Sequence, residues 1–259
     1  MPRAAVLAVL VFLASFLQAF SSSRTPNFTE AGSQELGLAD LMPSSLFAFG
    51  MSVGELEKVI QSRYPTWARS ERKRATNNRN DPSLSAKAKT PYLQTLSISH
   101  ESSAQGIRQS YSFALTSPLS GNRVYSIVYK VEALDGVRGL VPVNTWAAGL
   151  FSRWGEKHGG ARSETRARAT YFFDLDHELI KEGGKICDQI YPSFHRLDEK
   201  TIDEVNKLVD LVVSTGCAYA KDSIVSLVDA LLISSSIFYS IDFASQAADV
   251  QRRVVFGED

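Results

Sequence analysis

The densest group of potential metal ligands in the chain is Asp174-Leu175-Asp176-His177-Glu178. On a β-strand, alternate side chains point to the same side. Asp174, Asp176 and Glu178 would then share one side, and three carboxylates together could bind a hard cation such as calcium. The same residues also fit a solvent-facing strand end that enters a turn, and this interpretation is favoured. The sequence therefore predicts no metal site and no cofactor.

A second motif, Ser70-Glu71-Arg72-Lys73, has the S-x-x-K spacing of the penicillin-recognising enzymes. In those enzymes the serine is the nucleophile, and the mechanism also requires S-D-N and K-T-G motifs. This chain contains neither partner motif, so the match is attributed to chance. Glycine-rich phosphate loops, serine-elbow motifs and catalytic carboxylate pairs are also absent from the sequence. A binding or assembly function is therefore favoured over catalysis.

Basic residues are concentrated between positions 63 and 89, where eight Lys and Arg stand against two acidic residues. The segment 66–91 is predicted to be a long loop. It could contact anionic lipid headgroups, cell-wall phosphates or an acidic protein, and a solvated loop with no partner fits equally well. The formal net charge of the whole chain is zero, which argues against a nucleic-acid partner. The candidate contacts to an anionic surface are Arg69, Arg72, Lys73, Arg74 and Arg79.

The first 21 residues have the pattern of a secretory signal peptide. Met1-Pro2-Arg3 carries positive charge, residues 4–17 have no charge and only one polar side chain, and Ala19-Phe20-Ser21 places small residues around a cleavage site. The apolar run is shorter than the roughly 20 residues that cross a bilayer. The predicted cleavage site also has no cysteine to which a lipid could be attached. The sequence therefore predicts an exported protein, periplasmic or secreted, with no transmembrane anchor after cleavage.

Two cysteines, Cys187 and Cys217, are the only ones in the chain. Because an exported protein meets oxidising conditions, the pair is predicted to form a disulfide bond. Two buried free thiols are the alternative. A metal site is disfavoured because no histidine lies near either cysteine at a zinc-finger spacing.

The rest of the sequence predicts a flexible leader over 22–45 and a globular region over 46–259. Ser52-Val53-Gly54-Glu55 forms a capping box, which predicts a helix that ends before Pro65. Alternating apolar residues predict strands over 92–99, 109–116 and 123–133, and the last two should form a hairpin.

After about residue 140, a second helix should carry Trp146 and Trp154 on its apolar side. A strand over 165–174 should pair with another over 185–191, and Asp198 should cap a third helix. Residues 223–243 are predicted to form two strands that turn at 234–236, followed by a short helix through Arg252. The pattern predicts an α+β fold: a mostly antiparallel sheet of hairpins, three to four packed helices, and two helix-plus-hairpin units divided near residue 140.

The segment from Phe49 to Ile60, with Tyr64-Pro65 after it, resembles the opening of small periplasmic two-layer domains. These include the β-lactamase inhibitor protein and the small lipoprotein of the outer-membrane assembly machine. Arg153-Trp154-Gly155 is similar to a helix end that recurs in such domains. The resemblance implies binding or assembly rather than catalysis. The chain departs from the pattern because it has no lipobox cysteine and has a longer loop over 66–91.

These observations favour an exported envelope protein that binds or helps to assemble another envelope component. An envelope hydrolase with a dispersed active site is the first alternative, and a ligand-sized cleft lined by titratable groups would favour it. Attachment to an anionic envelope surface through the basic segment is the second alternative.

Overall fold

The computed structural model describes residues 38–74, 91–134, 139–180, 184–194, 201–228 and 230–255. The chain divides into two units, 1–34 and 35–259, and all of the described residues belong to the second. The predicted signal peptide, most of the predicted leader, Arg79 and Asp198 lie outside the described residues.

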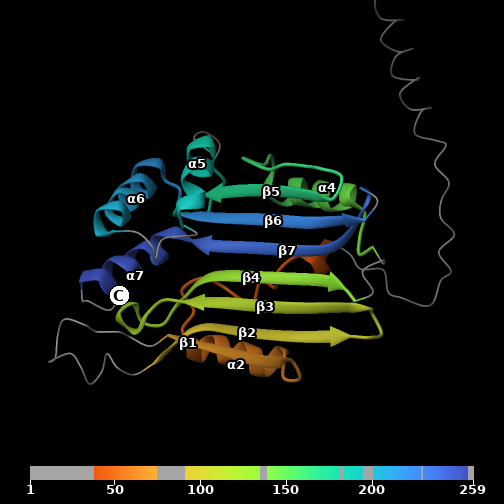
Figure 1. The fold of residues 1–259 in the computed structure, drawn as a ribbon, viewed down its shortest axis with the longest axis horizontal. Helices are drawn as coiled ribbons and strands as arrows, with labels where there is room; N and C mark the ends of the chain where they lie inside the picture. The colour runs from red at the N-terminus through yellow and green to blue at the C-terminus, as the bar shows by residue number, and fades with distance from the viewer. Residues whose placement is uncertain are drawn as a thin grey trace, which may run out of the picture. The chain divides into compact units, whose positions relative to one another are not determined.

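The second unit is built on one seven-stranded sheet in which every neighbouring pair of strands is antiparallel (Figure 1). This confirms the predicted α+β class with an antiparallel sheet. The strand order is β1-β2-β3-β4-β7-β6-β5. The strands are β1 (Ala68–Arg74), β2 (Tyr92–Ser102), β3 (Ile107–Leu115), β4 (Val124–Ala133), β5 (Arg166–Phe173), β6 (Tyr219–Val228) and β7 (Leu232–Asp242).

The described residues contain five α-helices, where three to four were predicted. They are α2 (Val53–Arg63), α4 (Val143–Trp154), α5 (Gly184–Phe194), α6 (Ile202–Thr215) and α7 (Phe243–Val255), with 3-10 turns at η1 (Leu38–Leu41) and η2 (Pro118–Ser120). The predicted capping box of α2 is confirmed: the Ser52 hydroxyl accepts from the Glu55 amide, and the Glu55 carboxylate accepts from the Ser52 amide.

The chain fills the sheet from both edges toward the middle. Strands β1 to β4 follow one another from one edge, and the chain then passes along α4 to β5 at the opposite edge. From there β6 and β7 lead inward, and β7 pairs with β4 over Ser126–Glu132. A helix thus precedes the strands on each side of residue 140, and one sheet runs through both halves.

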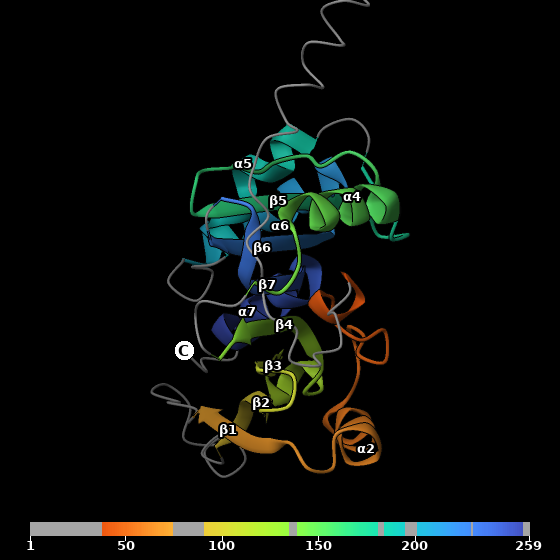
Figure 2. The same ribbon diagram turned by 90° about the vertical axis from the view of Figure 1, so that its right-hand side faces the viewer.

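The two faces of the sheet carry separate apolar clusters because side chains alternate along each strand. One face packs against α2, η1 and α4, which lie on the same side of the sheet (Figure 2). Leu56 of α2 and Trp146 of α4 are buried there with Phe113. The opposite face packs against α5, α6 and α7 through a smaller cluster that includes Phe172.

Helix α5 replaces the strand that was predicted over 185–191. Cys187, Tyr191 and Phe194 recur at helical spacing, and all three are buried in the cluster around Phe172. A strand would have sent neighbouring residues to opposite sides, whereas the helix turns these three side chains toward the sheet. The prediction failed because a short apolar run fits both patterns.

Three further boundaries differ from the predictions. Thr201, not Asp198, caps α6 through a capping box with Glu204. The strands β6 and β7 are connected through residues 229–231 rather than 234–236, so the serines belong to β7. Part of the predicted loop over 66–91 is the strand β1, which pairs with the edge of β2 in spite of its charged sequence.

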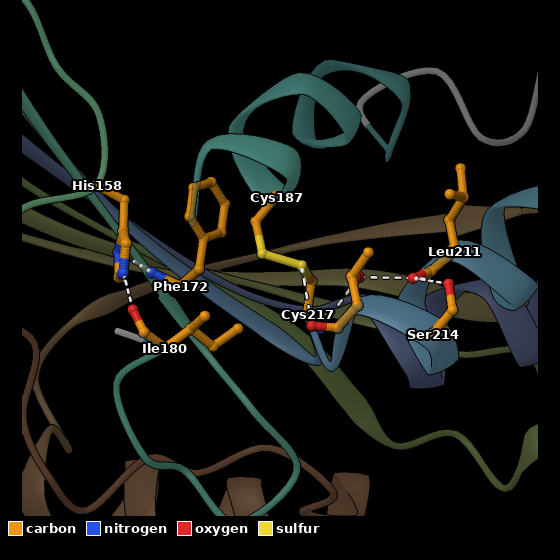
Figure 3. The surroundings of a disulfide bond; sticks show 8 residues. His158, Phe172, Ile180, Cys187, Leu211, Ser214 and Cys217 are labelled. Atoms are coloured by element: carbon orange, nitrogen blue, oxygen red, sulfur yellow. Dashed lines mark hydrogen bonds between the residues drawn. A yellow bond between two sulfur atoms is a disulfide. The ribbon is translucent and has the colours of Figure 1, made fainter. Parts of the chain in front are cut away.

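The predicted disulfide bond between Cys187 and Cys217 is present (Figure 3). It joins Cys187 of α5 to Cys217, which lies in the short segment between α6 and β6. Both cysteines are fully buried. His158 precedes strand β5, and its ring accepts a hydrogen bond from the amide of Phe172 on that strand at 3.1 Å. The other ring nitrogen contacts the Ile180 carbonyl oxygen.

Removing the disulfide should lower the free energy of unfolding by about 3–4 kcal/mol, because the bond closes a long loop in the unfolded chain. The two cysteines are 30 positions apart. The double variant Cys187→Ala/Cys217→Ala and the reduced wild type should both unfold at lower urea concentration. Reductant should not change the variant further. An unchanged urea midpoint on reduction of the wild type would contradict the stabilising role.

Candidate functional site

A cavity of about 460 Å³ lies on the face of the sheet that α4 and η1 cover. Its walls come from the segment 42–50, Ile127 of β4, the C-terminal end of α4, His177 in the turn after β5, and the strands β6 and β7. Its cationic and aromatic lining residues include Phe49, Arg153, Trp154, His177, Tyr219 and Lys221.

The segment 42–50 is fixed at both ends by hydrogen bonds to the sheet. The Ser44 amide donates to the Tyr111 hydroxyl at 2.9 Å, and the Gly50 amide donates to the Val124 carbonyl at 2.8 Å. Arg123 donates to the Gly50 carbonyl at 2.7 Å. Burial raises the pKa of Tyr111, which keeps its phenol neutral. These contacts hold one wall of the cavity on the sheet.

Trp154 is the last residue of α4, and two cationic side chains lie beside its ring. Its ring packs against Tyr171 and Phe238 at centroid distances of 5.1 and 5.5 Å. The Arg153 guanidinium lies 5.3 Å from the Trp154 centroid, and the Lys221 ammonium lies 5.2 Å from it. Arg153 is also in the last turn of α4, where the helix dipole favours a positive charge.

Lys221 occupies an inward-facing position of β6, directly beside Tyr171 of β5 and Ser240 of β7. Its Nζ lies 4.5 Å from the Phe173 ring centroid. Among the described residues, no carboxylate lies within 4.0 Å of this ammonium. Burial, and then the positive charge of Arg153, lower the pKa of Lys221. The ammonium is therefore held by aromatic rings without a neutralising partner.

Aromatic rings line the opposite wall. Phe49 and His177 both stack on Tyr219, with centroid distances of 5.6 and 4.3 Å. Burial, and then the nearby Asp242 carboxylate, raise the pKa of Tyr219, so its hydroxyl stays protonated. This part of the cavity wall is therefore aromatic, and the Tyr219 hydroxyl gives it a neutral polar group.

Asp242 is the one carboxylate among the described lining residues, and its oxygens are already bonded. One oxygen accepts from the Ser245 amide at 2.9 Å, and the other accepts from the Ser245 hydroxyl at 2.7 Å. These bonds cap the first turn of α7, where the free amides attract a negative charge. The carboxylate is therefore a structural cap rather than a free base.

Residues 174–178 form a turn directly after β5, so their carboxylates do not alternate along a strand as the alternative of a metal site required. The Asp174 carboxylate accepts from the amides of Asp176 and Glu178, at 3.0 and 2.9 Å. His177 has a positive φ of 64° in this turn, and its ring reaches Tyr219. In the described part of the chain, no three His, Cys, Asp or Glu side chains converge in a way that could hold a metal ion.

Four of the five candidate surface residues lie on the edge strand β1, and Arg79 lies outside the described residues. The Arg69 guanidinium forms ion pairs with Glu57 and Glu71, both at 2.7 Å. Arg72, Lys73 and Arg74 follow on the same strand, and the structure does not bring them into the cavity. Ser70 of the S-x-x-K motif is an exposed residue of this strand, not the buried helix start that the mechanism needs.

Sequence reasoning did not identify Lys221 or Arg153. Lys221 could have been found as a charged residue at the inward-facing position of the alternating run Tyr219, Lys221, Ser223 and Val225. The two tryptophans of α4 were interpreted as core residues. Trp146 is buried and donates to the Ser223 hydroxyl at 3.0 Å. Trp154 is half-buried and also lines the cavity.

Comparison with known proteins finds no matching family model, no matching curated protein and no matching solved structure. None of the helices in the described ranges has the length and apolar character required to cross a membrane.

Lys221→Met should stabilise the protein by about 1 kcal/mol, because it removes a desolvated charge that has no carboxylate partner. The pKa of Lys221 is lowered in the folded state. Below that pKa the buried ammonium therefore lowers the free energy of unfolding by its full amount. Between that pKa and the unfolded value near 10.4, the unfolded state binds more protons and wild-type stability rises with pH. Urea unfolding of both proteins between pH 6 and 10 should show the difference shrink as pH rises.

The exposed residue Lys58 offers a matched control. Lys58→Met should leave the unfolding free energy within about 0.5 kcal/mol of the wild type at every pH. If Lys221→Met instead destabilises the protein by more than the control does, Lys221 makes a favourable structural contact and the interpretation of its environment is wrong.

Proposed function

We propose that the chain is an exported binding protein whose cavity takes a small anion with an apolar, preferably aromatic, body. The observation that carries the proposal is the position of Arg153 and Lys221. Both cations lie beside the same Trp154 ring, line the same cavity and have no ion-pair partner among the described residues. A carboxylate or similar anion between them would relieve their repulsion and accept charge-assisted hydrogen bonds.

The apolar part of the ligand is inferred from the cavity walls and their surroundings. Phe49, Tyr219 and Phe238 line the cavity. Leu46, Phe151 and Leu175 are 42%, 64% and 68% exposed, and each lies within two positions of a lining residue. A volume of about 460 Å³ falls within the range of small-molecule sites. Aromatic walls around a few polar groups are typical of such sites.

Export is supported by two independent features. The first 21 residues have the pattern of a signal peptide, and the Cys187–Cys217 disulfide bond is compatible with an oxidising compartment. A periplasmic or secreted location follows as part of the proposal. The resemblance of residues 49–65 to small periplasmic two-layer domains points to the same class, binding or assembly, and stays a prediction.

The hydrolase alternative requires a nucleophile or water with a general base beside it. The cavity does contain titratable groups, as that alternative expects. However, Asp242 caps α7, and His177 is stacked on Tyr219. Neither is placed as a base hydrogen-bonded to Ser240, the hydroxyl of β7 in the same cavity. Binding is therefore the better supported function.

Calorimetry with 3-phenylpropionate should detect binding, and Arg153→Gln should weaken it about tenfold or more, because one charge-assisted hydrogen bond is worth about 1.5–3 kcal/mol. The neutral analogue 3-phenylpropanamide should lose a similar factor with the wild type. Arg166→Gln changes an exposed residue of β5 outside the cavity and should have no effect. Equal affinity for the acid and the amide would contradict the proposed anion site.

A second candidate function is attachment to an anionic surface through β1. This strand is an edge of the sheet, and six of its seven residues are exposed. Arg72 adds positive charge there, Arg69 is neutralised by two glutamates, and the Lys73 ammonium lies 4.0 Å from one of them, Glu71. The competing explanation is that a charged edge prevents unwanted strand pairing between molecules.

The wild type should sediment with vesicles of phosphatidylglycerol and phosphatidylcholine in a salt-sensitive way. Charge reversal of Arg72, Lys73 and Arg74 together should abolish this binding, since each cation contributes about 1 kcal/mol near such a surface. Arg153→Gln serves as the control and should sediment like the wild type. If the triple variant binds the vesicles as well as the wild type does, β1 is only a protected edge.

A further inference from the structure

We propose that Lys221 is a nucleophile that forms an imine with a carbonyl group of the bound ligand, and that the ligand class is the 2-oxo acids with an aromatic body. The inference rests on the proposed anion-binding function and adds a covalent step to it. The juxtaposition that carries it is an amine without a carboxylate partner, fixed beside a second cation on the wall of a ligand-sized cavity.

The backbone around Lys221 is held firmly, so its position in the cavity is set by the sheet. β6 lies between β5 and β7, and the register pairs Lys221 with Tyr171 on one side and Ser240 on the other. The side chain is directed between the rings of Trp154 and Phe173. A bound carbonyl group would therefore meet the amine from the cavity side.

The charged and titratable groups that face Lys221 favour a reactive amine. Arg153 approaches from α4, Tyr171 from β5, Asp242 from β7 and His177 from the turn after β5, and Tyr219 precedes Lys221 by two positions on its own strand. The carboxylate of Asp242 is bonded to Ser245 and forms no ion pair with Lys221. Desolvation beside another cation is one of the ways in which proteins activate a lysine amine. The lowered pKa of Lys221 has these same two causes.

The proposed step needs no oxidant or reductant. The lone pair of the neutral Nζ attacks the carbonyl carbon, and the carbonyl oxygen gains a proton to give a carbinolamine. Loss of that hydroxyl as water, with the remaining proton of the nitrogen leaving to solvent, forms the C=N bond. One amine and one carbonyl thus give one imine and one water. The Arg153 guanidinium would hold the carboxylate of the same ligand.

The competing explanation is that Lys221 buries its aliphatic stem against Trp154 and serves only packing. A packing role would be retained by an arginine and would give the amine no special reactivity. The two explanations therefore predict different reactivity of the Lys221 amine, and a measurement of stability would not distinguish them.

The test uses the full chain with its disulfide intact, incubated with phenylpyruvate and sodium cyanoborohydride at pH 7 and analysed by intact mass and peptide mapping. The reductant converts an imine into a stable secondary amine. We expect one adduct at Lys221, formed at least about tenfold faster than at the exposed Lys58, because an ordinary lysine with a pKa near 10.4 is almost fully protonated at this pH.

Lys221→Arg and Lys221→Met should both lose the adduct, and Lys221→Arg should still bind 3-phenylpropionate because the positive charge is kept. Lys58→Arg, the matched control, should be labelled like the wild type. If the wild type binds 3-phenylpropionate but labels Lys221 no faster than Lys58, the imine is overturned and the binding function stands. If the wild type binds neither 3-phenylpropionate nor phenylpyruvate, both proposals fail.

Discussion

The cavity depends on one constraint, the alternation of side chains along β6. Lys221 shares its side of the sheet with Tyr219 and Val225, so it must face α4. A slip of one residue would turn it to the opposite face but would also expose the core residues of the strand. The ammonium is therefore kept on the face where Trp154 and Phe173 lie. Cation–π contacts there partly compensate its lost hydration, and they leave it free to meet an anion.

The disulfide bond and the cavity lie on opposite faces of the sheet. Helices α5, α6 and α7 and the disulfide bond cover one face, while α4 and the segment 42–50 form the cavity on the other. One link between the two faces is β5, in which Phe172 points to the disulfide cluster and Phe173 to Lys221. Another link is Asp242 of β7, which lines the cavity and caps the first turn of α7.

Local patterns predicted much of the fold and almost none of the site. The capping box at Ser52 and the alternation in β2, β3 and β4 depend on neighbouring residues, so they could be read directly. Helix α5 was missed because its short apolar run fits a strand as well, and β1 was missed because only pairing with β2 makes its charged residues extended. The cavity joins residues near positions 49, 153 and 221, which are brought together by the order of the strands. Lys221 carried a usable signal, a charge at an inward-facing position, but its aromatic neighbours come from other elements.

The most direct measurement is a crystal structure of the protein grown with 3-phenylpropionate. The carboxylate should lie between the Arg153 guanidinium and the Lys221 ammonium, with the phenyl ring against Trp154 or Tyr219. The Lys221 ammonium should remain without a protein carboxylate within 4.0 Å. A ligand bound only at the basic β1 edge, or a Lys221 ammonium paired with Asp242 in an empty cavity, would contradict the account.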